Sequence, residues 1–129
     1  MFTQAADAQQ LLVDVQLDID DGNNHNARLL ADELTQTANA TTDQIGTLAN
    51  WADAQATVVA IAGLMDLGSR AALSYHSWFA DGKRAALRQA KSLRSANGDQ
   101  VPDANTDLAA LASLGLTCPG TQLSLEAPR

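Results

Sequence analysis

Three aspartates near the start of the chain form its densest group of side chains with catalytic potential, Asp18, Asp20 and Asp21. At the end of a strand, which the surrounding pattern predicts, their carboxylates could hold Mg²⁺ and act on phosphate groups. A calcium-binding loop does not fit, because Asn23 stands at the sixth position from Asp18, where glycine is required, and Leu29 at the twelfth. The same three aspartates are also typical of the solvated end of a strand, where no metal is bound. A magnesium-dependent, phosphate-handling enzyme is therefore an alternative and not the main hypothesis.

The two histidines and the cysteine do not form a pattern typical of catalysis or metal binding. His25 and His76 lack the spacing of paired zinc ligands, and no second cysteine accompanies them. Cys118 precedes a Pro-Gly turn, which is typical of a small structural side chain, and it could act as a nucleophile only beside a histidine. A glycine-rich phosphate loop and a nucleophilic serine motif are also missing from the sequence. We therefore expect a protein without enzymatic activity, metal or cofactor.

The segment from Lys83 to Arg94 concentrates the positive charge of an acidic protein. The whole chain has a net charge of −7, and all fifteen acids lie outside this segment. The segment holds five of the eight basic residues, so it carries +5 against −12 for the remainder. On a helix, Arg84, Arg88 and Lys91 share one face, because they are separated by steps of four and three residues. This face is either simply solvated or a docking surface for an acidic protein or for RNA phosphates.

Three large aromatic residues are further candidates for a protein interface. The chain has only five aromatic residues, and its largest apolar surfaces belong to Trp51, Trp78 and Phe79. If exposed, these side chains would mark an interaction surface, because large exposed apolar patches are typical of binding sites. The scarcity of aromatic residues beside the basic segment argues against recognition of single-stranded RNA by base stacking.

The composition indicates a single soluble domain over residues 1–129. An apolar fraction of 46% can form a core without a metal or a disulfide, and the lone cysteine excludes an internal disulfide. The first ten residues lack the basic and apolar segments of a signal peptide. The longest apolar run, Ala56 to Met65, is about half the length of a membrane-spanning helix. We expect an intracellular protein that does not enter a membrane.

Three segments have the patterns of β-strands. Val13 to Asp20 alternates apolar and polar residues, which predicts a half-exposed strand, and Asp21 to Asn24 then forms a turn. Ala56 to Ala62 is rich in β-branched residues and free of charge, which predicts a strand buried on both faces. Leu123 to Glu126 alternates as well and is expected to form a short third strand.

Helices are expected between these strands, each with its own start or stop signal. Thr41 and Gln44 match a capping box, which places the start of a helix there. Gly63 to Gly68 is expected to form a loop, and Asp81-Gly82 to end the helix that begins at Ser69. The full set of expected helices is a short one over residues 4–10, followed by helices that begin near residues 26, 41, 69, 83 and 105.

Strands separated by helices indicate an α/β domain, with a small, mainly parallel sheet of about three strands covered by helices. An all-α bundle is the alternative, because alanine and leucine are abundant throughout the chain. On a helix, the acids of residues 13–20 would spread around every side, which favours the sheet. A sheet this small leaves an edge strand, and pairing of that edge across a twofold axis predicts a homodimer.

The C-terminal region resembles part of a known family. The stretch Thr106 to Leu116, followed by Leu125-Glu126-Ala127-Pro128, is similar to the small assembly-cofactor protein of cystoviruses, the enveloped double-stranded RNA bacteriophages. The apolar segment Ala56 to Ala62 is similar in placement, as is the early Leu11-Leu12-Val13 with the acids that follow it.

The resemblance implies a role in a viral polymerase complex. Members of that family stabilise the nucleus of capsid assembly and support packaging of the RNA genome. The partners would be other proteins of the capsid and polymerase complex, with RNA contacted at most indirectly. The protein would reside in the virion interior or in the cytoplasm of the bacterial host. The residues alone also leave open an acidic helical decoy or inhibitor that mimics nucleic acid.

Overall fold

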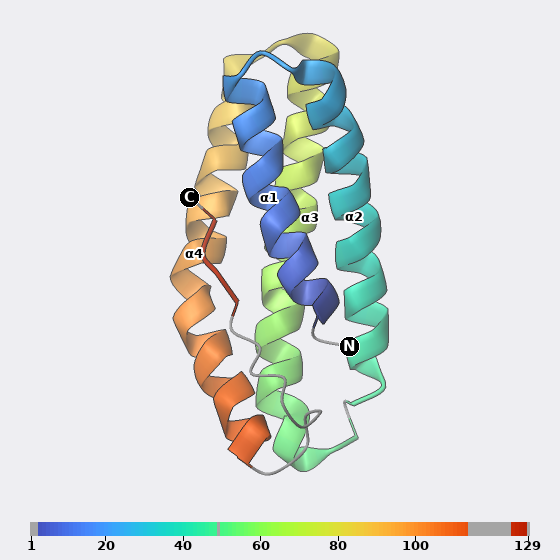
Figure 1. Cartoon of the computed structure of the whole chain (residues 1–129), viewed down its shortest axis with the longest axis vertical. Coiled ribbons are helices and arrows are strands. Elements are labelled where there is room, and N and C mark those ends of the chain that lie inside the picture. Colours follow the sequence, from blue (N-terminus) through green and yellow to red (C-terminus); the bar gives the residue numbers. More distant parts are fainter. Residues whose placement is uncertain (1–2, 49, 114–124, 129) are drawn as a thin grey trace.

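The computed structural model shows an up-and-down bundle of four helices (Figure 1). It describes residues 3–48, 50–113 and 125–128. The elements in chain order are α1 (Thr3–Asp20), α2 (Asn24–Gly46), a short 3-10 helix η1 (Ala52–Ala54), α3 (Gln55–Asp81) and α4 (Arg84–Ser113). The described residues contain no β-strand. The predicted α/β fold with a small parallel sheet is therefore wrong, and its alternative, the all-α bundle, is the observed fold.

Each helix packs along its neighbour in the chain, α1 on α2, α2 on α3 and α3 on α4, and α1 also touches α3. Short connections make consecutive helices antiparallel. The C-terminal segment, which we define as residues 125–128, lies between α1 and α4 and contacts both helices (Figure 1). The bundle therefore has one side on which two helices are separated by a non-helical segment of the same chain.

Small and aliphatic side chains at helical spacing form the core. The buried positions of α2 follow steps of four and three residues, at Ala27, Ala31, Leu34, Ala38, Thr41 and Ile45. This spacing is typical of helices that pack side by side at a small angle. Alanine contributes many of the buried positions, and Tyr75 of α3 is the largest side chain that is fully buried. A core of small residues suits a chain with few aromatic residues.

The alternating segment Val13 to Asp20 lies in α1 and is not a strand. The helix buries Val15 and Gln16, whereas Leu17, which the alternation places on the inner face, is 54% exposed. The residues that precede the segment are mainly alanine, glutamine and leucine, which favour a helix. Among the described residues no strand lies beside it to supply pairing. The segment therefore continues the helix that begins before it.

The apolar segment Ala56 to Ala62 also lies in a helix, α3. Thr57 and Ile61 are buried while Val59 is 72% exposed, so the segment buries one helical face and not both faces of a strand. β-branched residues disfavour a helix by only a few tenths of a kcal/mol each. Burial of one isoleucine contributes about 2 kcal/mol, which outweighs that preference. The predicted loop at Gly63 to Gly68 is wrong as well, because α3 continues through it.

The helix starts predicted at residue 41 and near residue 105 are wrong, because α2 and α4 continue across these positions. Thr41 does not cap a helix, since its hydroxyl donates to the backbone carbonyl of Thr37 within α2, at 2.7 Å. Pro102 lies inside α4, where it removes one backbone hydrogen bond. The helix nevertheless continues, because Val101 and Ala104 on either side of the proline are buried in the core.

The turns predicted around Gly22 and Gly82 are confirmed. Both glycines have positive φ, 78° and 64°, a conformation that other residues rarely adopt. Gly82 ends α3, and its N–H donates to the backbone carbonyl of Trp78 at 2.7 Å. The helix expected to begin near residue 26 begins at Asn24, and Asn23 caps it, because its side chain accepts a hydrogen bond from the N–H of Asn26. Both turns lie at the same end of the bundle (Figure 1).

The predicted third strand, Leu123 to Glu126, lies partly outside the described residues. Leu125 and Glu126 are described, and they belong to the non-helical C-terminal segment without pairing to any described strand. The side chain of Asn105 in α4 binds the backbone of Leu125 instead. A helix side chain therefore takes the place that a neighbouring strand was predicted to fill.

The helical residues Ala52–Asp81, which comprise η1 and α3, are together long and apolar enough to cross a membrane, judged by length and composition alone. The mean hydropathy of its most apolar window is 1.4, and 44% of that window is buried inside the bundle. The central helix of a soluble bundle passes the same test, so this observation is only weak support for a membrane segment.

Candidate interaction site

The three aspartates of the metal-binding alternative lie at the end of α1 and in the turn that follows. Asp18 accepts a hydrogen bond from the side-chain amide of Asn26 at 2.5 Å, which joins the end of α1 to the start of α2. Asp20 accepts one from the side-chain amide of Gln16 at 2.8 Å. In residues 3–48, 50–113 and 125–128, no three His, Cys, Asp or Glu side chains gather closely enough to hold a metal ion.

Three basic side chains, Arg84, Arg88 and Lys91, form one exposed face of α4, which we call the basic surface. On the other side of the same turns, Ala90 and Leu93 are buried in the core. No ion pair or side-chain hydrogen bond between described residues involves the basic surface. These three charges are therefore available to groups outside the bundle.

Arg94, the last base of the same segment, has a different environment because it is only 8% exposed. It lies near the phenol of Tyr75, whose hydroxyl donates to the side-chain carbonyl of Gln16 in α1 at 2.8 Å. Burial raises the pKa of Tyr75 to about 12, while the positive charge of Arg94 opposes this rise and the negative charge of Asp20 adds to it. Arg94 therefore belongs to the polar interior of the bundle and not to the basic surface.

The three candidate aromatic residues lie at two different ends of the bundle. Trp51, in the connection between α2 and η1, is 51% exposed. Trp78 and Phe79 lie half-buried near the end of α3, with ring centroids 5.5 Å apart. The guanidinium of Arg28 lies 5.6 Å from the centroid of the Phe79 ring, which is within range of a cation–π contact. The structure thus brings Trp78 and Phe79 to the end of the bundle where α4 and its basic surface begin, and leaves Trp51 at the other end (Figure 1).

A buried amide pair is a feature that the sequence analysis missed. The side chains of Gln9 in α1 and Asn97 in α4 exchange two hydrogen bonds, of 2.7 and 3.0 Å. Asn97 also donates to the backbone carbonyl of Leu64 in α3 at 3.1 Å. Both side chains are buried, so the pair joins three helices inside the bundle. The signal for it was spacing, because Asn97 stands four residues after Leu93 and four before Val101 on the inward stripe of α4.

Comparison of the chain with protein-family models gave no matching family, and comparisons with curated proteins and with solved structures gave no match either. They therefore add no family evidence for a viral or capsid role.

Proposed function

We propose that this protein is a non-enzymatic interaction module that docks an acidic partner protein through the basic surface of α4. The observation that carries the proposal is the exposed, unpaired state of Arg84, Arg88 and Lys91 on a chain with a net charge of −7. Acidic side chains are abundant elsewhere on the chain, yet none of the described ones pairs with this face.

The placement of these charges is unfavourable for α4 itself. Arg84 and Arg88 are like charges four residues apart, which destabilises a helix by a few tenths of a kcal/mol. Arg84 is also the first residue of the helix, where the helix dipole disfavours positive charge. By contrast, Arg70 on α3 has Asp66 four residues before it, and the two form an ion pair of 3.7 Å. Docking of carboxylates would relieve the repulsion on α4, whereas solvation alone leaves it in place.

Aromatic side chains near the basic surface support the same proposal. Trp78 and Phe79 are half-buried at the end of α3, just before the turn that leads into α4. Arginine and tryptophan are the side chains most enriched among residues that dominate the energy of protein interfaces. A partner that contacts both would combine charge steering with burial of apolar surface.

The kind of partner comes from the resemblance of residues 106–116 and 125–128 to the cystovirus assembly cofactors. On that basis we propose that the acidic partner is a protein of a viral capsid and polymerase complex, met in the virion interior or the host cytoplasm. The homodimer was predicted from pairing of a sheet edge, and this reason does not apply because the described residues form no strand. Sedimentation of the purified protein measures whether the helical bundle forms a dimer.

The test compares two variants that have the same net charge. Arg84→Gln/Arg88→Gln/Lys91→Gln neutralises the basic surface and brings the net charge from −7 to −10. Gln36→Glu/Asn39→Glu/Gln44→Glu reaches the same −10 through exposed positions of α2. Each protein is immobilised and exposed to an extract of its native source at low and high salt, since exposed charges are screened beyond about 10 Å at 0.1 M salt.

We expect the wild type and the α2 variant to retain the same salt-sensitive partner, and the α4 variant to lose it. Association of the purified partner should slow at low salt in the α4 variant alone, because steering charges act mainly on the association rate. Equal capture and equal salt dependence for all three proteins would remove the basic surface from the interface.

A second candidate, the acidic helical decoy that mimics nucleic acid, gains support from the all-helical fold and the charge of −12 outside the basic segment. It makes the opposite prediction for the same two variants. A decoy binds a basic partner through its acids, so both variants, which are three charges more negative, should bind that partner more tightly than the wild type.

A further inference from the structure

The side of the bundle between α1 and α4 is closed by the C-terminal segment (Figure 1). This segment reaches its place from the far end of α4, with residues 114–124 intervening in the sequence. Its contacts show what the groove between the two helices recognises.

The backbone of Leu125 is held by a single side-chain amide. Asn105 of α4 donates from Nδ2 to the carbonyl of Leu125 at 2.8 Å, and its Oδ1 accepts from the N–H of the same residue at 2.7 Å. Both backbone groups of one residue are thereby satisfied, as they would be by a neighbouring strand. A contact of this kind recognises extended main chain whatever the side chain is.

The side chain at the same position is recognised separately. Leu125 is only 2% exposed and packs within the core of the bundle. Two residues further on, Ala127 and Pro128 lie beside Gly98 of α4, where an added Cβ would come within 3.5 Å of Ala127 and 3.7 Å of Pro128. A Cβ at Gly98 would thus make ordinary contacts with both residues, whereas a side chain longer than alanine would meet the segment.

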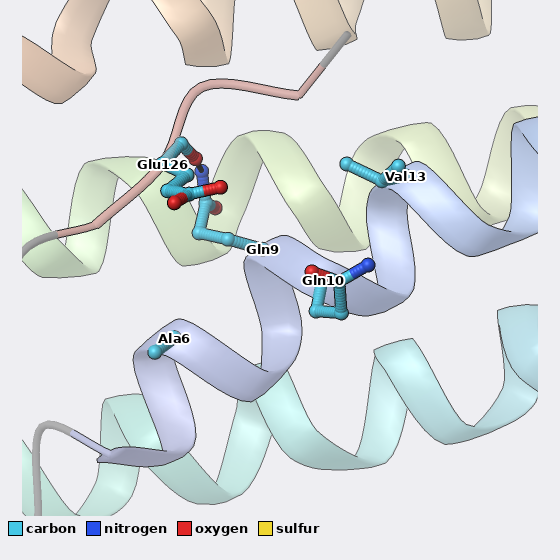
Figure 2. Close-up of a pocket in the computed structure, with 5 residues that line it drawn as sticks. All are labelled: Ala6, Gln9, Gln10, Val13 and Glu126. Atoms are coloured by element: carbon cyan, nitrogen blue, oxygen red, sulfur yellow. Dashed lines mark hydrogen bonds between the residues drawn. The ribbon is translucent and has the colours of Figure 1, made fainter.

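A second contact joins the segment to α1, and open space lies beside it. The side-chain amide of Gln9 in α1 donates to the backbone carbonyl of Glu126 at 3.2 Å. Figure 2 shows Gln9 reaching from α1 to the segment, beside an open pocket of about 250 Å³ that Ala6, Gln10 and Val13 of α1 also line. The side chain of Glu126 is exposed at the edge of this pocket. The open space therefore lies between α1 and the segment, next to the position of Glu126.

We propose that the groove between α1 and α4 is a docking site for an extended peptide segment of a partner protein, with leucine at its first position and small residues or proline at its third and fourth. Residues 125–128 occupy this site as an intramolecular competitor. The site uses Gln9, Gly98 and Asn105, none of which belongs to the basic surface, so the proposal does not depend on the function proposed above.

Tethering explains why the site is closed in the isolated chain. A covalently linked segment competes at an effective concentration on the order of millimolar. A partner's segment therefore gains access only if it binds more tightly than residues 125–128, or if the tethered segment is weakened. Weakening the tethered segment exposes the site for measurement.

The experiment uses the full chain with Leu125→Ala and the probe fluorescein-Gly-Gly-Leu-Glu-Ala-Pro-amide, followed by fluorescence anisotropy. We expect the variant to bind the probe at least about tenfold more tightly than the wild type, because loss of the leucine weakens the competitor. A probe with alanine in place of leucine is the matched control and should bind at least about tenfold more weakly. Adding Asn105→Ala to the variant should abolish binding, whereas neutralising the basic surface should leave it unchanged.

Three outcomes would overturn the proposal. The first is a variant with an unchanged helical circular dichroism spectrum that fails to bind the probe at millimolar concentration. The second is probe binding that is unaffected by Asn105→Ala. The third is a concentration-dependent dimer of the wild type that Leu125→Ala dissolves, since this would assign the groove to the C-terminal segment of a second copy. If Leu125→Ala does not fold, Leu125→Val, which keeps a smaller apolar side chain, takes its place in the same measurements.

Discussion

The bundle is closed in different ways at the interface between α2 and α3 and at the interface between α1 and α4. Between α2 and α3 the helices meet directly, and Gly68 of α3 faces Leu34 of α2, where an added Cβ would make an ordinary contact of 3.8 Å with Cδ1. Between α1 and α4 the helices are joined by the buried amides Gln9 and Asn97 and by the inserted segment at Leu125. The first side depends on apolar packing, and the second on hydrogen bonds that must all be satisfied.

This difference has consequences for specificity. Apolar contacts tolerate many side chains of suitable size, so the buried part of the α2–α3 interface selects its neighbour mainly by shape. The contact between His76 of α3 and Asp32 of α2, at 3.0 Å, lies at its partly exposed edge. A buried amide without its partner is strongly disfavoured, so the α1–α4 side accepts only groups that complete its hydrogen bonds. A site for exchangeable ligands is therefore expected on the polar side of the bundle and not on the apolar side.

The largest effect is expected on the apolar side. Leu34→Ala should lower the free energy of unfolding by about 3 kcal/mol, because it removes a fully buried leucine and leaves a cavity between α2 and its neighbours. Leu29→Ala, on the same helix but 53% exposed, is the matched control and should change stability by less than about 0.5 kcal/mol. Urea denaturation followed by circular dichroism measures both, and equal effects would contradict the packing described for α2.

A pH-dependent effect is expected at Tyr75, where α3 contacts α1. The folded state raises the pKa of this phenol from 10.0 to about 12, so its contribution to stability is complete below pH 10 and is lost as the pH rises towards 12. The loss should reach about 2–3 kcal/mol, at about 1.4 kcal/mol for each pH unit. The measurement is the difference in unfolding free energy between the wild type and Tyr75→Phe from pH 8 to 12.

That difference should be constant up to pH 10 and then decline. Because Tyr75 is the only tyrosine in the chain, the absorbance change on phenol ionisation reports this residue alone. A difference that stays constant to pH 12, or a tyrosine that ionises near pH 10 in the folded protein, would contradict the buried position of the phenol.

The smallest of the three effects is expected at the amide pair between α1 and α4. Asn97→Ala should lower the free energy of unfolding by about 2 kcal/mol, because Gln9 and the carbonyl of Leu64 lose a buried partner. The double variant Gln9→Leu/Asn97→Leu should recover part of this loss, since Gln9 is then no longer a buried amide without its partner, and the recovery is partial because the carbonyl of Leu64 still lacks this donor. Gln10→Ala on the exposed face of α1 is the control, and a double variant less stable than Asn97→Ala would show that the pair is not the cause.

The sequence predicted which residues of a segment face the core more reliably than it predicted whether the segment is a helix or a strand. Ala27, Leu34 and Ala38, which recur in the sequence at steps of seven and four residues, are buried, and so are Leu108 and Leu111, three residues apart near the end of α4. Spacing of three and four residues places side chains on one face of a helix regardless of what the helix packs against. The same property gave the exposed face of Arg84, Arg88 and Lys91.

The strand predictions failed where two periodicities overlap. In the segment Val13 to Asp20, Val15 is inward in a strand and in a helix alike, so its burial does not distinguish the two. Only Gln16 and Leu17 distinguish them, and their exposure depends on which neighbour packs against α1. A strand needs a second strand beside it, and local sequence carries no information about whether one is present.

The sequence by itself determined the inward stripes, the charged face of α4 and the two glycine turns that reverse the chain, because these depend on residues within a few positions of one another. Only the tertiary structure decided that the chain is an all-helical bundle and that Gln9 meets Asn97, 88 residues away. The same holds for Asn105 and the backbone of Leu125, 20 residues apart. An amide side chain can bond to any main chain or amide that reaches it, so its partner is fixed by packing and not by local sequence.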